Sequence, residues 1–165
     1  MPRLRILRTG LYVLAIVLAD AVSPVCAPVV AQTAAFQRYQ TGNLGIESSG
    51  RMHEFRIELA KTARQQAQGL MFRRRMDRDA GMLFVYDTPQ IITMWMKNTY
   101  IPLDMIFIGA DLRVSSIAER TIPQSLETIS SQKPSVAVLE VNAGTVRRLG
   151  LKVGDRVKSA FLGGG

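Results

Sequence analysis

Six polar side chains that could take part in chemistry lie in or beside short apolar runs. They supply two carboxylates, two cations and two amides, and they are Asp104, Glu140, Arg73, Lys97, Asn98 and Asn142. Side chains two residues apart share one face of a β-strand, so Asp104 is expected beside Ile106 and Glu140 beside Val138. Burying an unpaired carboxylate costs several kcal/mol. Each carboxylate therefore predicts a sheet edge, a nearby cation or a raised pKa.

One interpretation gathers the six side chains at one mouth of the fold. Lys97 and Arg73 are the nearest candidate cations for the two carboxylates, and Asn98 and Asn142 add amide donors and acceptors. Such a cluster would bind a small polar or acidic ligand or an envelope partner. In the alternative, a structural network, Asp104 and Asn142 cap turns while Lys97 neutralises Glu140. The sequence leaves both open.

Catalysis is a second possibility. A hydrolase or lyase would use the Lys97 ammonium, or Asp104 and Glu140 as paired carboxylates, but no sequence feature fixes the separation of the two carboxyl groups. His53 is the single histidine and precedes a strand in a polar context, so a Ser-His-Asp site has weak support. The catalytic residues stay unassigned, and a binding domain without catalysis of its own is the leading hypothesis.

A soft-metal site is the third possibility. Met94 and Met96 flank Trp95 and would share a strand face, and with His53 they would suit a monovalent copper or silver ion, as in periplasmic chaperones. Methionine is nevertheless mainly a flexible packing residue, and the chain has eight. One cysteine and one histidine exclude an intrachain zinc site or disulfide framework. We expect no metal and no cofactor.

The N-terminus is typical of an export signal. Three arginines precede an apolar run over residues 11–19, and Val29 and Ala31 occupy the small-residue positions of a cleavage site. The run is too short to span a bilayer, so residues 1–31 are expected to be a cleaved secretory signal peptide, with no stable membrane span afterwards. The protein is then periplasmic or secreted, and Cys26 is lost with the signal.

Charge indicates the kind of partner. The net charge is +8, and cleavage removes three arginines and Asp20. An exported basic protein meets phosphates and acidic groups of the envelope first, so we expect no nucleic-acid partner. Residues 72–79 form a basic loop broken by two acids, which is either solvated surface or a contact for an anion or a membrane.

The 165 residues, 47% hydrophobic and 21% charged, fit one domain. We expect a flexible arm over 32–52, a single domain over 53–162 and a mobile tail over 163–165. Seven short runs are strand-like: 55–59, 81–86, 91–96, 103–108, 114–118, 136–141 and 157–161. Thr62 and Gln65 predict a capping box that begins a helix ended by Gly69, and Asn142 is expected to cap a second helix. The fold class is mainly β, a compact sandwich or barrel of about seven short strands with two short helices.

Four motifs, read together, resemble a known family. They are Gly-Leu-Met-Phe-Arg at 69–73, Gly-Met-Leu-Phe at 81–84, Trp-Met-Lys-Asn-Thr followed by Ile-Pro-Leu-Asp at 95–104, and Leu-Glu-Val-Asn-Ala-Gly at 139–144. In this order and spacing the chain resembles the domain of unknown function family 192 over residues 55–161. The resemblance implies a compact, mainly β domain, often exported, with no established activity. Met94 departs from the family pattern, in which an aromatic or small residue more usually precedes the Trp.

Overall fold

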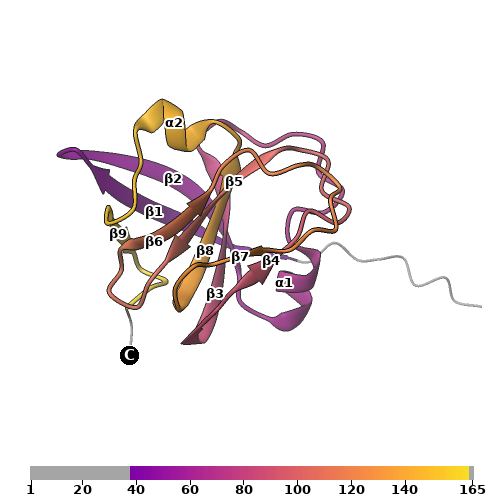
Figure 1. Cartoon of the computed structure of the whole chain (residues 1–165), viewed down its shortest axis with the longest axis horizontal. Helices are drawn as coiled ribbons and strands as arrows, with labels where there is room; N and C mark the ends of the chain where they lie inside the picture. Colours follow the sequence, from indigo (N-terminus) through magenta and orange to yellow (C-terminus); the bar gives the residue numbers. More distant parts are fainter. Residues whose placement is uncertain (1–37, 164–165) are drawn as a thin grey trace, which may run out of the picture. The chain divides into compact units, whose positions relative to one another are not determined.

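A computed structural model describes residues 38–163, which fold around one curled sheet (Figure 1). The sheet has seven strands in the order β6-β5-β8-β3-β2-β1-β9. They are β1 (Gln40–Ser48), β2 (Arg51–Ala60), β3 (Ala80–Gln90), β5 (Leu103–Ile108), β6 (Val114–Ala118), β8 (Ser135–Asn142) and β9 (Arg156–Ser159). The short strands β4 (Thr93–Met94) and β7 (Ile129–Ser130) form a second, two-stranded sheet. The helices are α1 (Ala63–Gln68) and α2 (Thr145–Leu149).

The main sheet curls until its two edge strands are connected through the backbone. A bridge joins Arg113, just before β6, to Arg156 of β9. Beside it, the Val114 amide donates to the Asp155 carbonyl over 2.9 Å, and the Val157 amide donates to the Leu112 carbonyl over 2.8 Å. The predicted mainly β fold with two short helices is confirmed, and of its two forms the structure adopts the barrel-like one.

The central strands of the sheet are buried on both faces. All six residues of β5 are buried, which explains why its sequence is a continuous apolar run broken only by Asp104. The inner face packs around a core that includes Leu44, Ile57 and Ile106. The outer face packs a second core, which includes Met82 and Phe107, beneath the segments that carry β4 and β7.

The expected flexible arm over 32–52 differs from the structure from residue 40 onward, because β1 pairs with β2 along its whole length. Leu44 and Ile46 are fully buried in the inner core. The glycines of this segment, which suggested a loose arm, make room for neighbours. A Cβ on Gly42 would lie 2.5 Å from the Phe161 ring, and one on Gly45 would lie 2.6 Å from the Met52 sulfur.

The connection between β2 and β3 crosses the outer face, and these two strands are parallel. It begins with α1, where the predicted capping box of Thr62 and Gln65 is confirmed and Gly69 ends the helix. The basic loop of residues 72–79 follows, after Leu70 and Met71. A parallel pair in a largely antiparallel sheet therefore brings the arginine-rich loop over the outer face.

Two further local expectations were wrong. The run 91–96 forms only the short β4, because Met96 leaves the strand to bond through its amide to the Ser125 carbonyl. Helix α2 begins after Gly144, in the left-handed conformation, and Asn142 does not cap it. The expected signal peptide lies outside the described residues, as does most of the expected tail. Within residues 38–163, neither helix is long and apolar enough to cross a membrane.

Candidate functional site

Asp104 is a structural carboxylate on the inner face of the sheet. Its side chain is fully buried and shares the face of β5 with Ile106, in the inner core. One oxygen accepts the Arg120 amide and the other accepts the Val146 amide in the first turn of α2, each over 2.9 Å. Backbone donors, one of them in the first turn of a helix, thus satisfy both oxygens of this carboxyl group.

Glu140 lies on the outer face, opposite to Asp104. On this face it stands between its cross-strand neighbours Met82 of β3 and Met105 of β5. The residue is 4% exposed, and no described side chain or amide donates to its carboxyl oxygens. Burial raises the pKa of Glu140 to about 8. The carboxyl is therefore largely protonated at neutral pH, which lowers the cost of burying it.

Arg73 anchors the basic loop to the sheet. Its guanidinium donates two hydrogen bonds to the Glu58 carboxylate, each 2.6 Å long. Glu58 stands on the outer face beside Met82, so this ion pair lies in the same cross-strand row as Glu140. Both side chains of the pair are about one-third exposed. Because the bonds are bidentate and charge-assisted, they fix the direction in which the loop leaves the sheet.

The two asparagines also hold the basic loop. The Asn142 amide group donates to the carbonyls of Met76 and Asp77. The Asn98 carbonyl accepts the Phe72 amide over 2.8 Å. Both contacts join the ends of other elements to residues 72–77, so the Asn142 side chain and the Asn98 backbone position a surface loop from beneath.

Lys97 does not neutralise Glu140. It is exposed, with its ammonium 5.1 Å from the centre of the Trp95 ring. Of the six predicted residues, the structure thus brings Arg73, Asn98 and Asn142 to the underside of one loop. Glu140 lies on the sheet face in the row of the Arg73 anchor, Lys97 points outward, and Asp104 is separated from them by the sheet. One mouth containing all six residues does not form.

A basic–aromatic surface lies on the solvent side of these anchors, and its residues are Phe72, Arg74, Arg75, Trp95, Lys97 and Tyr100. The Phe72 and Tyr100 rings meet edge to face with centroids 6.3 Å apart, and the Arg74 guanidinium lies 5.7 Å from the centre of the Tyr100 ring. Phe72, Trp95 and Tyr100 are 52%, 48% and 40% exposed. Exposed aromatic groups beside cations are typical of an interaction surface.

The backbone of this surface is strained where the aromatic group is presented. Phe72 has a φ of 66°, in the left-handed region that bulky side chains seldom adopt, whereas Asn98, with a φ of 55°, is of a residue type that tolerates this region. Backbone strain of this kind costs on the order of 1–3 kcal/mol and persists where surrounding contacts impose it. Here the Arg73 ion pair and the Asn98 carbonyl impose it, and the result is a Phe72 ring held toward solvent.

Phe72, Tyr100 and Glu58 were missed as site residues by reasoning from the sequence. The sequence did contain a pattern that indicates this surface. Phe72 directly precedes three consecutive arginines, and Trp95 and Tyr100 lie on either side of Lys97. Aromatic residues interleaved with basic ones differ from an ordinary solvated loop. Nothing local, however, indicated that the two segments lie side by side.

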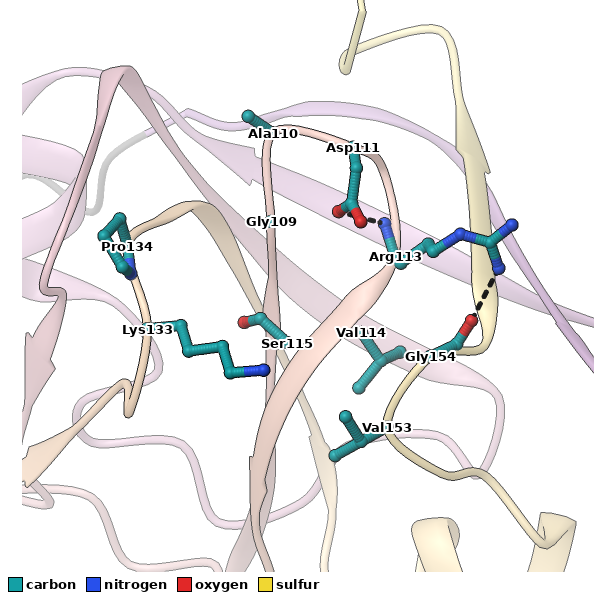
Figure 2. A pocket seen from close by; sticks show the side chains of 10 residues that line it. All are labelled: Gly109, Ala110, Asp111, Arg113, Val114, Ser115, Lys133, Pro134, Val153 and Gly154. Carbon is teal, nitrogen blue, oxygen red and sulfur yellow. Dashed lines mark hydrogen bonds between the residues drawn. The ribbon is translucent and has the colours of Figure 1, made fainter.

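A separate pocket of about 430 Å³ opens where the curled sheet closes (Figure 2). The Arg113 guanidinium in its wall donates to the Gly154 carbonyl, and Asp111 accepts the Arg113 amide. In Figure 2 the Lys133 side chain points toward Ser115. These hydrogen bonds stabilise a turn and the junction of β6 with β9. Lys133 is an exposed lysine, and alone it does not form a ligand-binding site.

The methionines considered for a soft-metal site lie where packing residues would lie. Met94 and Met96 do both contact the outer core. His53 shares a face of β2 with Phe55, whose side chain packs in the inner core. Within residues 38–163, no group of three histidine, cysteine, aspartate or glutamate residues could hold a metal ion.

Comparisons with known proteins place the sequence in a group without assigned activity. The model of domain of unknown function family 192 (DUF192, uncharacterized ACR) matches residues 45–159. No curated protein matches significantly. A crystal structure from Sinorhizobium meliloti, provisionally described as a transcription regulator, is 46% identical with a TM-score of 0.73, covering 75% of this chain and 97% of its own. A protein of unknown function from Novosphingobium aromaticivorans is 39% identical with a TM-score of 0.72, covering 85% and 95%.

Proposed function

The chain belongs to the DUF192 family of uncharacterized proteins, and we propose that it is an exported binding domain that attaches to an anionic component of the cell envelope. The proposed contact is the basic–aromatic surface. Export is supported by the N-terminal pattern of three arginines, an apolar run and a Val29-x-Ala31 cleavage site. Intact mass of the protein recovered from the envelope should place its first residue near Gln32, and a retained N-terminus would contradict export by cleavage.

The observation that carries the proposal is the stacking of cations on exposed aromatic rings across two loops. Arg74 lies over Tyr100 and Lys97 over Trp95, and Arg75 beside them is exposed. A cation on a ring keeps most of its donors free for an external acceptor. The strained, anchored backbone supports a pre-formed surface, which loses less conformational entropy on binding.

Catalysis by the predicted groups is less well supported than binding. Paired carboxylates must face one substrate, whereas Asp104 and Glu140 lie on opposite faces of the sheet. Both Asp104 oxygens are occupied by backbone donors. Lys97 is exposed, and its ammonium lies over the Trp95 ring on the solvent side of the fold.

The test measures binding of inorganic polyphosphate by calorimetry to the protein as recovered from cells. Replacing Arg74→Glu and Lys97→Glu together should weaken binding by about tenfold or more, because each change replaces an attraction by a repulsion. Arg156→Glu is the matched control, since Arg156 is exposed on β9, away from this surface. Equal weakening by the control, or no binding by the parent protein, would refute the proposal.

A further inference from the structure

We propose that the basic–aromatic surface docks on the headgroup region of a bilayer that contains anionic phospholipids. The inference rests on the proposed function and names its partner. A soluble polyanion and a membrane both satisfy the cations of the surface. They differ in what they offer to exposed apolar side chains, because only the membrane supplies an acyl boundary in which such groups lose contact with water.

The surface carries more apolar area than a phosphate contact requires. Beside its three aromatic residues lie Ile122 and Leu126, which are 68% and 66% exposed. Aliphatic side chains gain nothing from a phosphate chain and do not stack on nucleic-acid bases, whereas aromatic rings alone would serve either. At a membrane, Trp and Tyr settle at the headgroup level and aliphatic residues reach the acyl chains.

The aliphatic residues are tied to the aromatic ones through the backbone. The Gln124 amide donates to the Thr99 carbonyl and the Met96 amide to the Ser125 carbonyl, each over 3.1 Å. The segments 95–100 and 122–126 are therefore neighbours, and the Phe72 amide joins the basic loop to the first of them. Three segments from distant parts of the sequence thus present apolar groups together.

The distribution of charges around the surface is consistent with a membrane that contacts the basic loop. Arg74, Arg75 and Arg78 are exposed on that loop, while its two acids, Asp77 and Asp79, both pair with Arg56. On the other side, Glu119 and Glu127 lie in a pocket beside Ile122. The acidic groups thus limit the contact on the Ile122 side, and the arginines and Lys97 face the anionic headgroups.

Trp95 makes a direct test possible because it is the single tryptophan of the chain. The full chain is mixed with phosphatidylcholine vesicles with or without phosphatidylglycerol, and Trp95 emission and its quenching by brominated acyl chains are recorded. We expect a shift to shorter wavelength and quenching only with phosphatidylglycerol. Any apolar segment at the N-terminus is common to all variants, so differences among them report on this surface.

Two pairs of variants complete the test. Leu126→Ser and Arg74→Glu should each reduce quenching, whereas the exposed controls Val153→Ser and Arg156→Glu should leave it unchanged. If polyphosphate binds through the same arginines while Trp95 stays unquenched by vesicles, the membrane inference fails and the proposed function stands. If neither vesicles nor polyphosphate bind, both fail. Quenching reduced equally by the controls also overturns the inference.

Discussion

At the residue scale, the ionisation of Glu140 links stability to pH. Burial raises the pKa of its carboxyl to about 8, above the unfolded value, so the folded protein binds this proton more tightly than the unfolded chain. The stabilisation is complete below the unfolded pKa of about 4.3 and is lost as the pH rises through the folded value. The pKa of Tyr86 is also raised, mainly by burial and in addition by the negative charge of ionised Glu140.

Glu140→Gln should remove this dependence. Between pH 5 and pH 8 the parent protein should lose on the order of 3 kcal/mol of unfolding free energy relative to the variant. At pH 5 the two should agree within about 1.5 kcal/mol, because Gln keeps the shape of the protonated acid. Urea denaturation of both proteins across this range measures the difference. Parallel stability curves would show that Glu140 is ionised in the folded protein.

Replacing Asp104, in contrast to Glu140, should lower the stability of the fold strongly. Asp104→Ala leaves the partly buried amide of Arg120 and the buried amide of Val146 without their acceptor and should cost roughly 3–5 kcal/mol. Asp111→Ala is the matched control, because Asp111 also accepts a backbone amide but does so in an exposed turn. Its cost should stay within about 1 kcal/mol. Similar losses for both variants in chemical denaturation would contradict the structural role of Asp104.

At the element scale, the conformation of the basic loop exposes the Phe72 ring to solvent and contributes little to the stability of the fold. Phe72→Gly removes a half-exposed ring and also relieves the left-handed strain at that position. We expect the unfolding free energy to change by no more than about 1 kcal/mol, since the two effects oppose each other. Polyphosphate binding should nevertheless weaken. A large loss of stability in denaturation would show that the ring belongs to the core.

The elements also show where reasoning from the sequence succeeds. The runs 103–108 and 114–118 match β5 and β6, and the α1 capping box is confirmed, because burial and capping leave local patterns. Strand β1 was missed, because its glycines leave space for the Phe161 ring and the Met52 side chain, which lie elsewhere in the sequence. The face of each carboxylate was predictable from alternation, but which face lies inside the curled sheet was not.

At the scale of the whole molecule, the curled sheet separates two environments. Its inner face is a continuous apolar core in which Asp104 is satisfied by backbone amides. Its outer face supports the loops that carry the basic–aromatic surface, anchored through Glu58, Asn98 and Asn142. The candidate site could not be predicted in full because it combines segments near residues 72, 97 and 124, which meet only through the β2–α1–β3 crossover and the loop beside β7.

The most direct test of anion binding at the basic–aromatic surface is amide chemical-shift mapping of the protein on titration with inorganic polyphosphate. We expect the largest shifts to fall on residues 72–75 and 95–100, and to disappear in the variant with Arg74→Glu and Lys97→Glu. The β9 control Arg156→Glu should show the same map as the parent protein. Shifts centred instead on the pocket formed by residues 109–115, Lys133 and Gly154 would contradict it and place the anion at the closure of the sheet.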